Sequence, residues 1–135
     1  MSSKYERELR AMLERVGYVV IRSAGSMGEG DLVAIEPATS IATVIEVKSV
    51  KGDRFYSSNT QLGKDQYRHM QEMMSRGVRC CYAVRWKGQR CHHGVDVEDK
   101  WDFFRILPDR GYPVLRLGLP TLSSMVQSVA KRGTI

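Results

Sequence analysis

The sequence predicts an α/β fold in which a central sheet of about five strands is flanked by helices. Two patterns predict this fold class. Apolar side chains recur at helical spacing over residues 3–16 and 61–76. Runs rich in β-branched or alternating apolar residues, typical of strands, occupy residues 18–22, 31–36, 42–48, 78–86 and 101–107. The expected order is therefore one helix, three strands, a second helix and two strands, followed by a C-terminal helical appendage.

Length and composition suit one globular domain. The chain has 135 residues, of which 42% are hydrophobic and 27% are charged. We assign a single domain to residues 1–135, with its core at about 4–107 and a C-terminal extension at about 108–135. No apolar run reaches membrane-spanning length, and the first residues lack the apolar core of a signal peptide. We therefore expect no membrane association and a cytoplasmic location.

The net charge of +6 favours an anionic partner. Nucleic acid ranks ahead of a membrane surface because no strongly basic amphipathic helix is present. A nucleotide cofactor has no support, since the sequence lacks a glycine-rich phosphate-binding loop. Basic enzymes without such partners also exist, so charge alone does not decide the function.

The first expected helix ends at Gly17, a typical stop residue. Its apolar stripe consists of Tyr5, Leu9, Met12, Leu13 and Val16. Glu6 falls on the border of that stripe, and two interpretations stay open. Its carboxylate reaches round the end of the sheet, or it is an exposed first-turn acid that interacts favourably with the helix dipole.

The next expected strand, residues 18–22, reads as buried and leads into a loop with three glycines in eight residues. This loop, residues 23–30, delivers the chain directly to Asp31. A glycine- and serine-rich loop beside carboxylates suits an element that closes over substrate, although many such loops only turn the chain.

The two strands at residues 31–36 and 42–48 read as a hairpin, because Pro37-Ala38-Thr39-Ser40 carries turn chemistry. Strand alternation puts Glu46 and Lys48 on one face. With Asp31, they gather two carboxylates and an ammonium at one place. Carboxylates suit Mg²⁺, and a nearby lysine stabilises charge on a phosphate. The alternative is an exposed edge-strand ion pair.

The polar segment after Lys48 places basic Lys51 and Arg54 next to aromatic residues. This composition suits nucleic-acid contact, and it equally suits an ordinary connecting loop. In the second helix, Gln66 falls within the apolar stripe of Leu62, Met70, Met73 and Met74. A core-facing amide needs a polar partner, either a backbone group or a metal-bound water.

Cys80 and Cys81, followed by Cys91-His92-His93, invite a zinc interpretation. The usual Cys-x-x-Cys spacing is absent, and adjacent strand residues face opposite sides. Small core residues are the favoured interpretation of Cys80 and Cys81. Beyond the last strand, Thr121 is a suitable cap for a final amphipathic helix.

These elements, in this order, resemble the archaeal-type Holliday-junction resolvases, a branch of the PD-(D/E)-x-K nuclease superfamily. The resemblance covers about residues 4 to 86, whereas the last forty or so match no pattern. Its motifs are Glu6-Arg7-Glu8-Leu9, residues 17–26, Asp31-Leu32-Val33-Ala34 and Ile45-Glu46-Val47-Lys48. The resemblance implies a restriction-endonuclease-like mixed sheet.

The resemblance also implies roles for individual residues. Asp31 and Glu46 match the metal-binding carboxylates, with the Val47 carbonyl as a further ligand. Lys48 matches the catalytic lysine, and Glu6 matches an additional helix-borne acid that also serves the metal. The implied cofactor is Mg²⁺, with Mn²⁺ as a substitute.

Arg7 and Arg22 match family arginines tied to DNA binding and cleavage, and Ser26 matches a catalytic serine of the mobile loop. Arg10, Lys51 and Arg54 are further candidate DNA contacts. Two departures stand out: the family's Lys-Gly pair before the first helix is absent, and Glu29 adds an acid beside the DNA-facing loop.

The implied activity is metal-dependent resolution of four-way DNA junctions by paired symmetric cuts. Two alternatives stay open: a related nuclease acting on another DNA substrate, and a non-catalytic DNA-binding module. A homodimer is expected because a junction has two-fold symmetry. Apolar surplus is a second reason, because the apolar stripe of the last helix adds to Trp86, Trp101, Phe103 and Phe104, and together they exceed what one small core is expected to bury. The alternative is that this helix simply packs on its own sheet.

Overall fold

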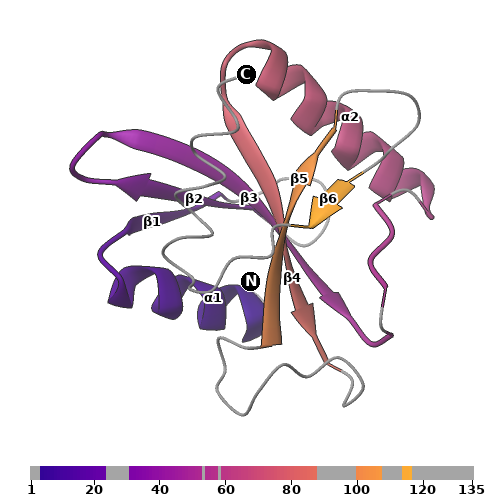
Figure 1. Cartoon of the computed structure of the whole chain (residues 1–135), viewed down its shortest axis with the longest axis horizontal. Helices are drawn as coiled ribbons and strands as arrows, with labels where there is room; N and C mark the ends of the chain where they lie inside the picture. The colour runs from indigo at the N-terminus through magenta and orange to yellow at the C-terminus, as the bar shows by residue number, and fades with distance from the viewer. Residues whose placement is uncertain are drawn as a thin grey trace.

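The computed structural model describes residues 4–23, 31–52, 54–57, 59–87, 100–107 and 114–116, with backbone alone at residues 23, 31 and 114–116. The predicted C-terminal helix and Cys91-His92-His93 lie outside this part of the chain. The order of elements matches the sequence-based expectation (Figure 1). They are α1 (Lys4–Arg15), β1 (Val19–Ser23), β2 (Asp31–Glu36), β3 (Ile41–Val50), α2 (Gln61–Ser75), β4 (Arg79–Trp86), β5 (Trp101–Ile106) and β6 (Val114–Arg116).

The described strands form one sheet in the order β1-β2-β3-β4-β5-β6. β3 and β4 run parallel, whereas the other neighbouring pairs are antiparallel. The predicted mixed sheet is therefore confirmed. The short β6, in the stretch predicted as an extension, adds a sixth strand beside β5.

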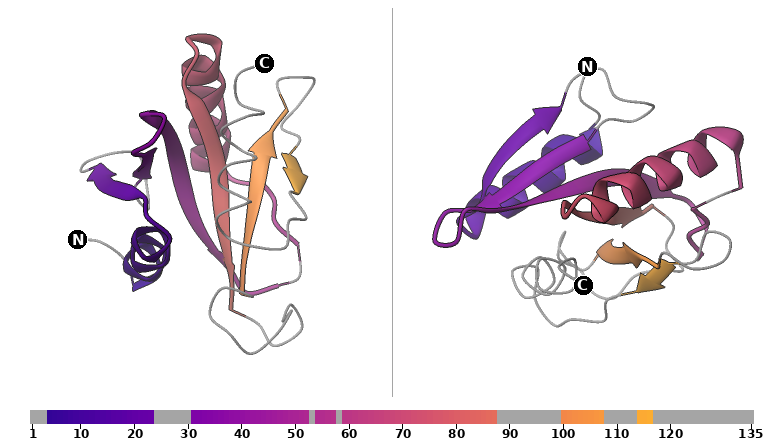
Figure 2. Two further views of the ribbon diagram at one scale, coloured as in Figure 1. Left: turned by 60° about the vertical axis from the view of Figure 1, so that its left-hand side comes forward. Right: turned by 90° about the horizontal axis from the view of Figure 1, so that it is seen from above.

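The two helices cover opposite faces of the sheet, as the two views in Figure 2 show. On the α1 face, Leu9, Met12 and Leu13 pack with Ile45 and Val47, along with other buried residues. On the α2 face, the cluster contains Tyr67, Met70, Cys80, Tyr82, Val84, Trp86, Phe104 and Ile106. Because strand residues alternate between faces, β3 contributes to both clusters.

Several details of the predicted core are confirmed and others are wrong. Gly17 ends α1 with a positive φ of 101°, which a residue with a Cβ rarely adopts. Cys80 and Cys81 are buried core residues, as expected. Leu62, which was predicted to face the core, is in contrast 46% exposed. Tyr67, which was not part of the predicted stripe, is fully buried instead.

β1 is not the fully buried strand that its apolar run predicts. Val19 and Ile21 are each 52% exposed, whereas Val20 between them is buried. The reason is topological: β1 is the sheet edge and packs on α1 with one face. A run of apolar residues does not reveal which of its faces is covered.

The four aromatic residues of the expected apolar surplus do not need a partner chain, whereas the last helix, whose stripe is the rest of that surplus, lies outside the described residues. Trp86, Trp101, Phe103 and Phe104 are all buried within one chain. The Trp86 Nε1–H donates to Asp102 Oδ2 over 2.6 Å, so even the polar edge of this ring is satisfied internally. Within the described residues, no helix is long and apolar enough to span a membrane.

The α1 helix is tied to the far strands through Glu8. Its Oε1 accepts from Arg85 Nε at 2.7 Å and from Trp101 Nε1 at 2.8 Å. The Arg85 guanidinium also lies over the Tyr5 ring, 5.2 Å from its centroid. These contacts join α1 to both β4 and β5, and we call Glu8, Arg85 and Trp101 the α1 anchor.

Candidate active site

The strand register of the β2–β3 hairpin places the two predicted carboxylate residues opposite each other. Asp31 is the direct cross-strand partner of Glu46. Residues paired in this way have neighbouring Cα atoms in an antiparallel ladder. The structure thus places these two positions at the same point of the sheet, as the motif spacing predicted.

Glu46 and Lys48 lie on the α2 face, since Ile45 and Val47 belong to the α1 cluster. Glu46 is buried, with 4% of the residue exposed. The side chain of Lys48 is 20% exposed, and its Nζ lies 3.8 Å from Glu46 Oε1. The interpretation of this pair as an exposed edge-strand ion pair is therefore wrong, because β3 is flanked by β2 and β4.

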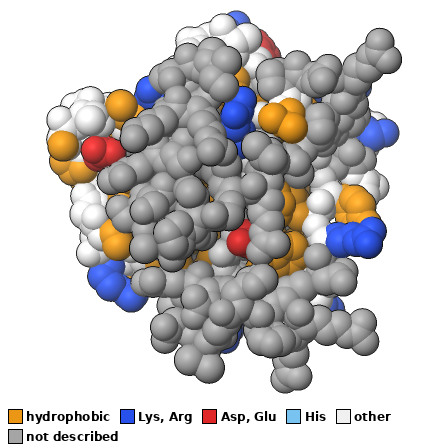
Figure 3. Space-filling view, in the orientation of Figure 1, with side chains coloured by type: hydrophobic (Ala, Val, Ile, Leu, Met, Phe, Trp, Pro, Cys, Tyr) orange, Lys and Arg blue, Asp and Glu red, His pale blue; other side chains and the backbone are white. Residues whose placement is uncertain are grey.

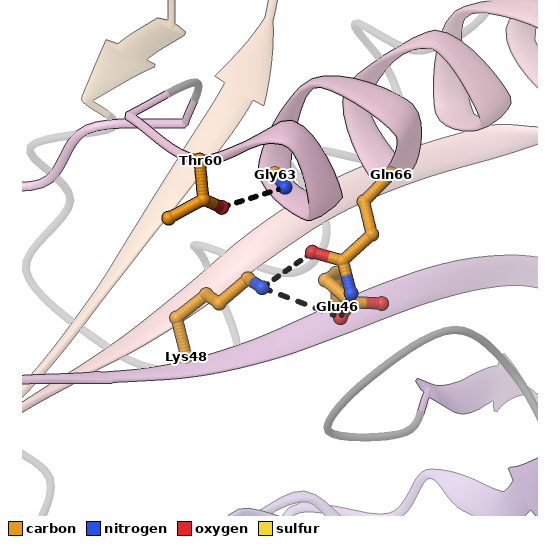
Figure 4. Close-up of polar contacts among 5 residues, drawn as sticks. All are labelled: Glu46, Lys48, Thr60, Gly63 and Gln66. Atoms are coloured by element: carbon orange, nitrogen blue, oxygen red, sulfur yellow. Dashed lines mark hydrogen bonds and ion pairs between the residues drawn. The ribbon is translucent and has the colours of Figure 1, made fainter.

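Gln66 of α2 connects the two charged side chains (Figure 4). Its Nε2 donates to Glu46 Oε1 over 3.0 Å, and its Oε1 accepts from Lys48 Nζ over 2.5 Å. The sequence indicated that this core-facing amide needs a partner. These two partners are side chains of β3, at sequence separations of 18 and 20 residues, which short-range patterns do not reveal.

The position of α2 follows from contacts at its N-terminal end and from one buried side chain. Thr60 caps the helix, with its Oγ1 accepting from Gly63 N at 2.9 Å. A Cβ at Gly63 would lie 2.8 Å from the Ser57 carbonyl oxygen, so the loop approaches the helix too closely for a larger residue. The Tyr67 hydroxyl donates to the Leu107 carbonyl over 2.7 Å.

Glu6 lies on the opposite face from Glu46, because α1 covers the other side of the sheet. It is 1% exposed, so its interpretation as an exposed first-turn acid is wrong. Arg22 Nε of β1 lies 3.5 Å from Glu6 Oε1. The structure pairs these two predicted site residues with each other and does not bring them beside Lys48.

The other predicted DNA contacts lie outside this centre. Arg7, Arg10, Lys51 and Arg54 are exposed, and Arg10 forms an ion pair with Glu14. Ser26 and Glu29 fall outside the described residues. On the face in Figure 3, the described Lys and Arg side chains stand in separate groups.

The aromatic residues next to Lys51 and Arg54 divide between core and surface. Phe55 packs against Tyr82 and Phe104, with ring centroids 4.9 and 5.2 Å apart, whereas Tyr56 is 61% exposed. Phe55 thus serves the core, and Tyr56 remains available for contact.

The donor set fits a hard cation at one end of this site. Glu46 supplies carboxylate oxygens, and the position opposite it in β2 is an aspartate. Among side chains that the structure describes, no three His, Cys, Asp or Glu groups gather into a metal cluster. Lys48 adds a positive charge that suits an anionic substrate rather than a second cation.

A scan against protein-family models matches residues 2–106 to the archaeal Holliday junction resolvase (Hjc) family. The chain belongs to this family. Over 62 residues, it is 39% identical to the crossover junction endodeoxyribonuclease Hjc of Methanocaldococcus jannaschii. That match covers 46% of this chain and 44% of the relative, so it spans less than half of either protein.

The fold agrees with this membership. The solved structure of Hjc from Archaeoglobus fulgidus, a Holliday junction resolvase, matches with a TM-score of 0.55 and 20% identity. The match covers 97% of this chain and 99% of that one. It confirms the predicted nuclease-like sheet flanked by helices.

Proposed function

We propose that this member of the Hjc family is a Mg²⁺-dependent endonuclease that resolves four-way DNA junctions by paired phosphodiester cuts. The observation that carries the proposal is the cross-strand pairing of Asp31 with Glu46, beside Lys48. Family membership gives the reaction class, and the net charge of +6 suits a polyanionic substrate.

In this proposal, Asp31 and Glu46 hold the cation, with the Val47 carbonyl and Glu6 as further ligands. When bound, Mg²⁺ polarises the phosphate and makes water acidic enough to attack at neutral pH. Mn²⁺ serves as a substitute. Glu6 reaches the cation only from beyond the end of the sheet, because its helix lies on the α1 face.

Lys48 supplies a positive charge opposite to the negative charge that the reaction develops. Its ammonium is partly exposed and lies at the edge of a buried carboxylate. In this position it orients the attacking water and offsets negative charge on the phosphoryl oxygens. Ser26 of the preceding loop acts on the cleavage rate.

Arg7, Arg10, Arg22, Lys51 and Arg54 bind the DNA backbone, reading phosphate positions and junction shape more than base sequence. The protein acts on DNA in the cytoplasm as a homodimer, because the two-fold symmetry of a junction matches two active sites related by one axis. The dimer proposal rests on the symmetry of the substrate, because the aromatic residues are buried within one chain.

The test compares a synthetic four-way junction with linear duplex, with and without Mg²⁺. Wild-type protein should cut the junction selectively and only with the metal. Glu46→Gln should abolish cleavage and retain junction binding, because it removes a metal ligand rather than a DNA contact. The matched control is Glu72→Gln, an exposed position on α2, which should cut normally.

Near wild-type cleavage by Glu46→Gln would refute the metal site. Equal cutting of duplex and junction would refute the substrate and favour the alternative of a nuclease with another DNA target. Binding without cleavage in wild-type protein would favour a non-catalytic module.

A further inference from the structure

We propose that Gln66 is a positioning residue that sets the spacing between Glu46 and Lys48. This inference rests on the proposed function and extends it to α2, which carries none of the predicted catalytic residues. The amide stands between a carboxylate and an ammonium of the same strand, and hydrogen-bonds to both (Figure 4).

The two hydrogen bonds fix the amide in one orientation. The NH₂ group donates to Glu46 and the carbonyl oxygen accepts from Lys48. Turning the amide over would set its NH₂ against an ammonium, which has no acceptor, and its oxygen against a carboxylate, which has no donor. The amide therefore distinguishes its two neighbours by charge and holds each in place.

The distances explain why a neutral bridge matters. Lys48 Nζ and Glu46 Oε1 are 3.8 Å apart, beyond hydrogen-bond length. Carboxylate and ammonium groups that meet directly approach to about 2.8 Å and become each other's hydrogen-bond partners. With Gln66 between them, the carboxylate of Glu46 has room for a cation and the ammonium of Lys48 has room for a phosphate oxygen.

The part of α2 that carries the Gln66 amide is held firmly in place. Gln66 is 4% exposed, and the next residue, Tyr67, is fully buried with its hydroxyl bonded to Leu107. The Thr60 cap and the close approach at Gly63 fix the start of the helix one turn earlier. The position of α2 on the sheet thus determines, through Gln66, how far apart Glu46 and Lys48 lie on β3.

The experiment uses Gln66→Met, which keeps side-chain length and loses both hydrogen bonds. We expect cleavage of the four-way junction to slow by roughly 10- to 100-fold, as for other groups that orient metal ligands. Calorimetric titration of the DNA-free protein with Mn²⁺ should show weaker binding. Junction affinity without metal should match that of Gln61→Met, the exposed control on the same helix, whereas the thermal unfolding midpoint should fall because two hydrogen bonds are lost.

A second variant, Gln66→Glu, tests the hydrogen bonds rather than the packing. At pH 8 it should be slower than wild type, because the introduced carboxylate repels Glu46. Lowering the pH protonates that carboxyl group and restores a donor. Its rate relative to wild type should therefore rise from pH 8 to pH 6, whereas the relative rate of Gln66→Met should stay flat.

The outcomes separate this inference from the proposed function. If both Gln66 variants cut within about two-fold of wild type and bind Mn²⁺ normally, while Glu46→Gln is inactive, the positioning role is wrong and the function stands. If Glu46→Gln is active, the proposed site itself is wrong. Should Gln66→Met fail to fold, the pH response of Gln66→Glu decides alone, and a flat ratio overturns the inference.

Discussion

The two faces of the sheet treat buried charge differently. On the α2 face, Glu46 and Lys48 stay 3.8 Å apart with a neutral amide between them. On the α1 face, the α1 anchor joins Glu8 directly to Arg85 at 2.7 Å. In a direct contact the two charged groups bind each other and stabilise the fold. A spaced pair leaves room for a ligand beside each charged group. The difference indicates that the α1 anchor stabilises the fold, whereas the spacing of Glu46 and Lys48 leaves room for a ligand.

Of the variants that compare the two faces, replacing the positively charged Lys48 on the α2 face has the largest expected effect. Lys48→Met should slow junction cleavage by about 10²- to 10³-fold, as loss of a group that stabilises transition-state charge does. Junction affinity and the unfolding midpoint should change little. Single-turnover cleavage and binding assays measure this, and Lys64→Met on α2 is the control. A loss of stability without a loss of rate in folded protein would remove the contrast between the faces.

Breaking the α1 anchor should affect stability instead. Glu8→Ala leaves two buried donors without their acceptor and should lower the free energy of unfolding by about 2–3 kcal/mol. Glu14→Ala, which removes an exposed ion pair of the same helix, should cost less than about 0.5 kcal/mol. Chemical denaturation measures both. Equal costs would mean that the anchor contributes no more than a surface contact.

Arg22 tests whether the α1 face also meets DNA. Its side chain is 30% exposed while it pairs with Glu6. Arg22→Gln should lower the slope of log affinity against log salt by about one, because one phosphate contact is lost. Arg76→Gln, at the far end of α2 and 75% exposed, should leave the slope unchanged. Identical slopes in both variants would place the DNA surface elsewhere.

The smallest expected effect is a loss of stability at alkaline pH, with one group on each face. Burial raises the pKa of the Cys81 thiol on the α1 face and of the Tyr82 hydroxyl on the α2 face. The unfolded chain therefore loses these protons first, so the stabilisation is complete below the unfolded pKa values and declines as pH rises above about 9.

Cys81→Ala and Tyr82→Phe should each flatten this decline in denaturation curves measured from pH 7 to 11. Tyr82→Phe should be well tolerated, because the hydroxyl is buried without a hydrogen-bond partner among the described residues. An unchanged decline in both variants would assign it to other groups.

The sequence predicted what depends on short-range periodicity. Strand alternation was enough to place Glu46 and Lys48 on one face, and the turn at residues 37–40 was enough to pair Asp31 with Glu46. It did not predict the burial of Glu6, because a residue at the border of a helical stripe turns inward or outward according to the tilt of the helix. The exposure of Val19 and Ile21 required knowing that β1 is an edge.

The hydrogen-bond partners of Gln66 were harder to predict from the sequence. Periodicity indicated that its amide faces the core, but its partners depend on how α2 docks after a crossover. The α1 anchor had no signal at all, since Glu8 and Arg85 are 77 residues apart and read as ordinary surface charges. Side-chain pairs between distant elements are set by packing, which single-sequence patterns do not contain.

The parallel pairing of β3 with β4 has a consequence for how the molecule assembles and opens. Antiparallel neighbours close through short turns, whereas this pair must wait for the crossover that contains α2. Glu46 and Lys48 belong to the β2–β3 hairpin, whereas Gln66 belongs to the crossover helix. The charge spacing thus depends on the docking of α2, and we expect a local opening that releases α2 to separate Gln66 from Glu46 and Lys48 while β1, β2 and β3 remain paired. The arrangement of these three side chains is consequently more fragile than the hairpin that carries two of them.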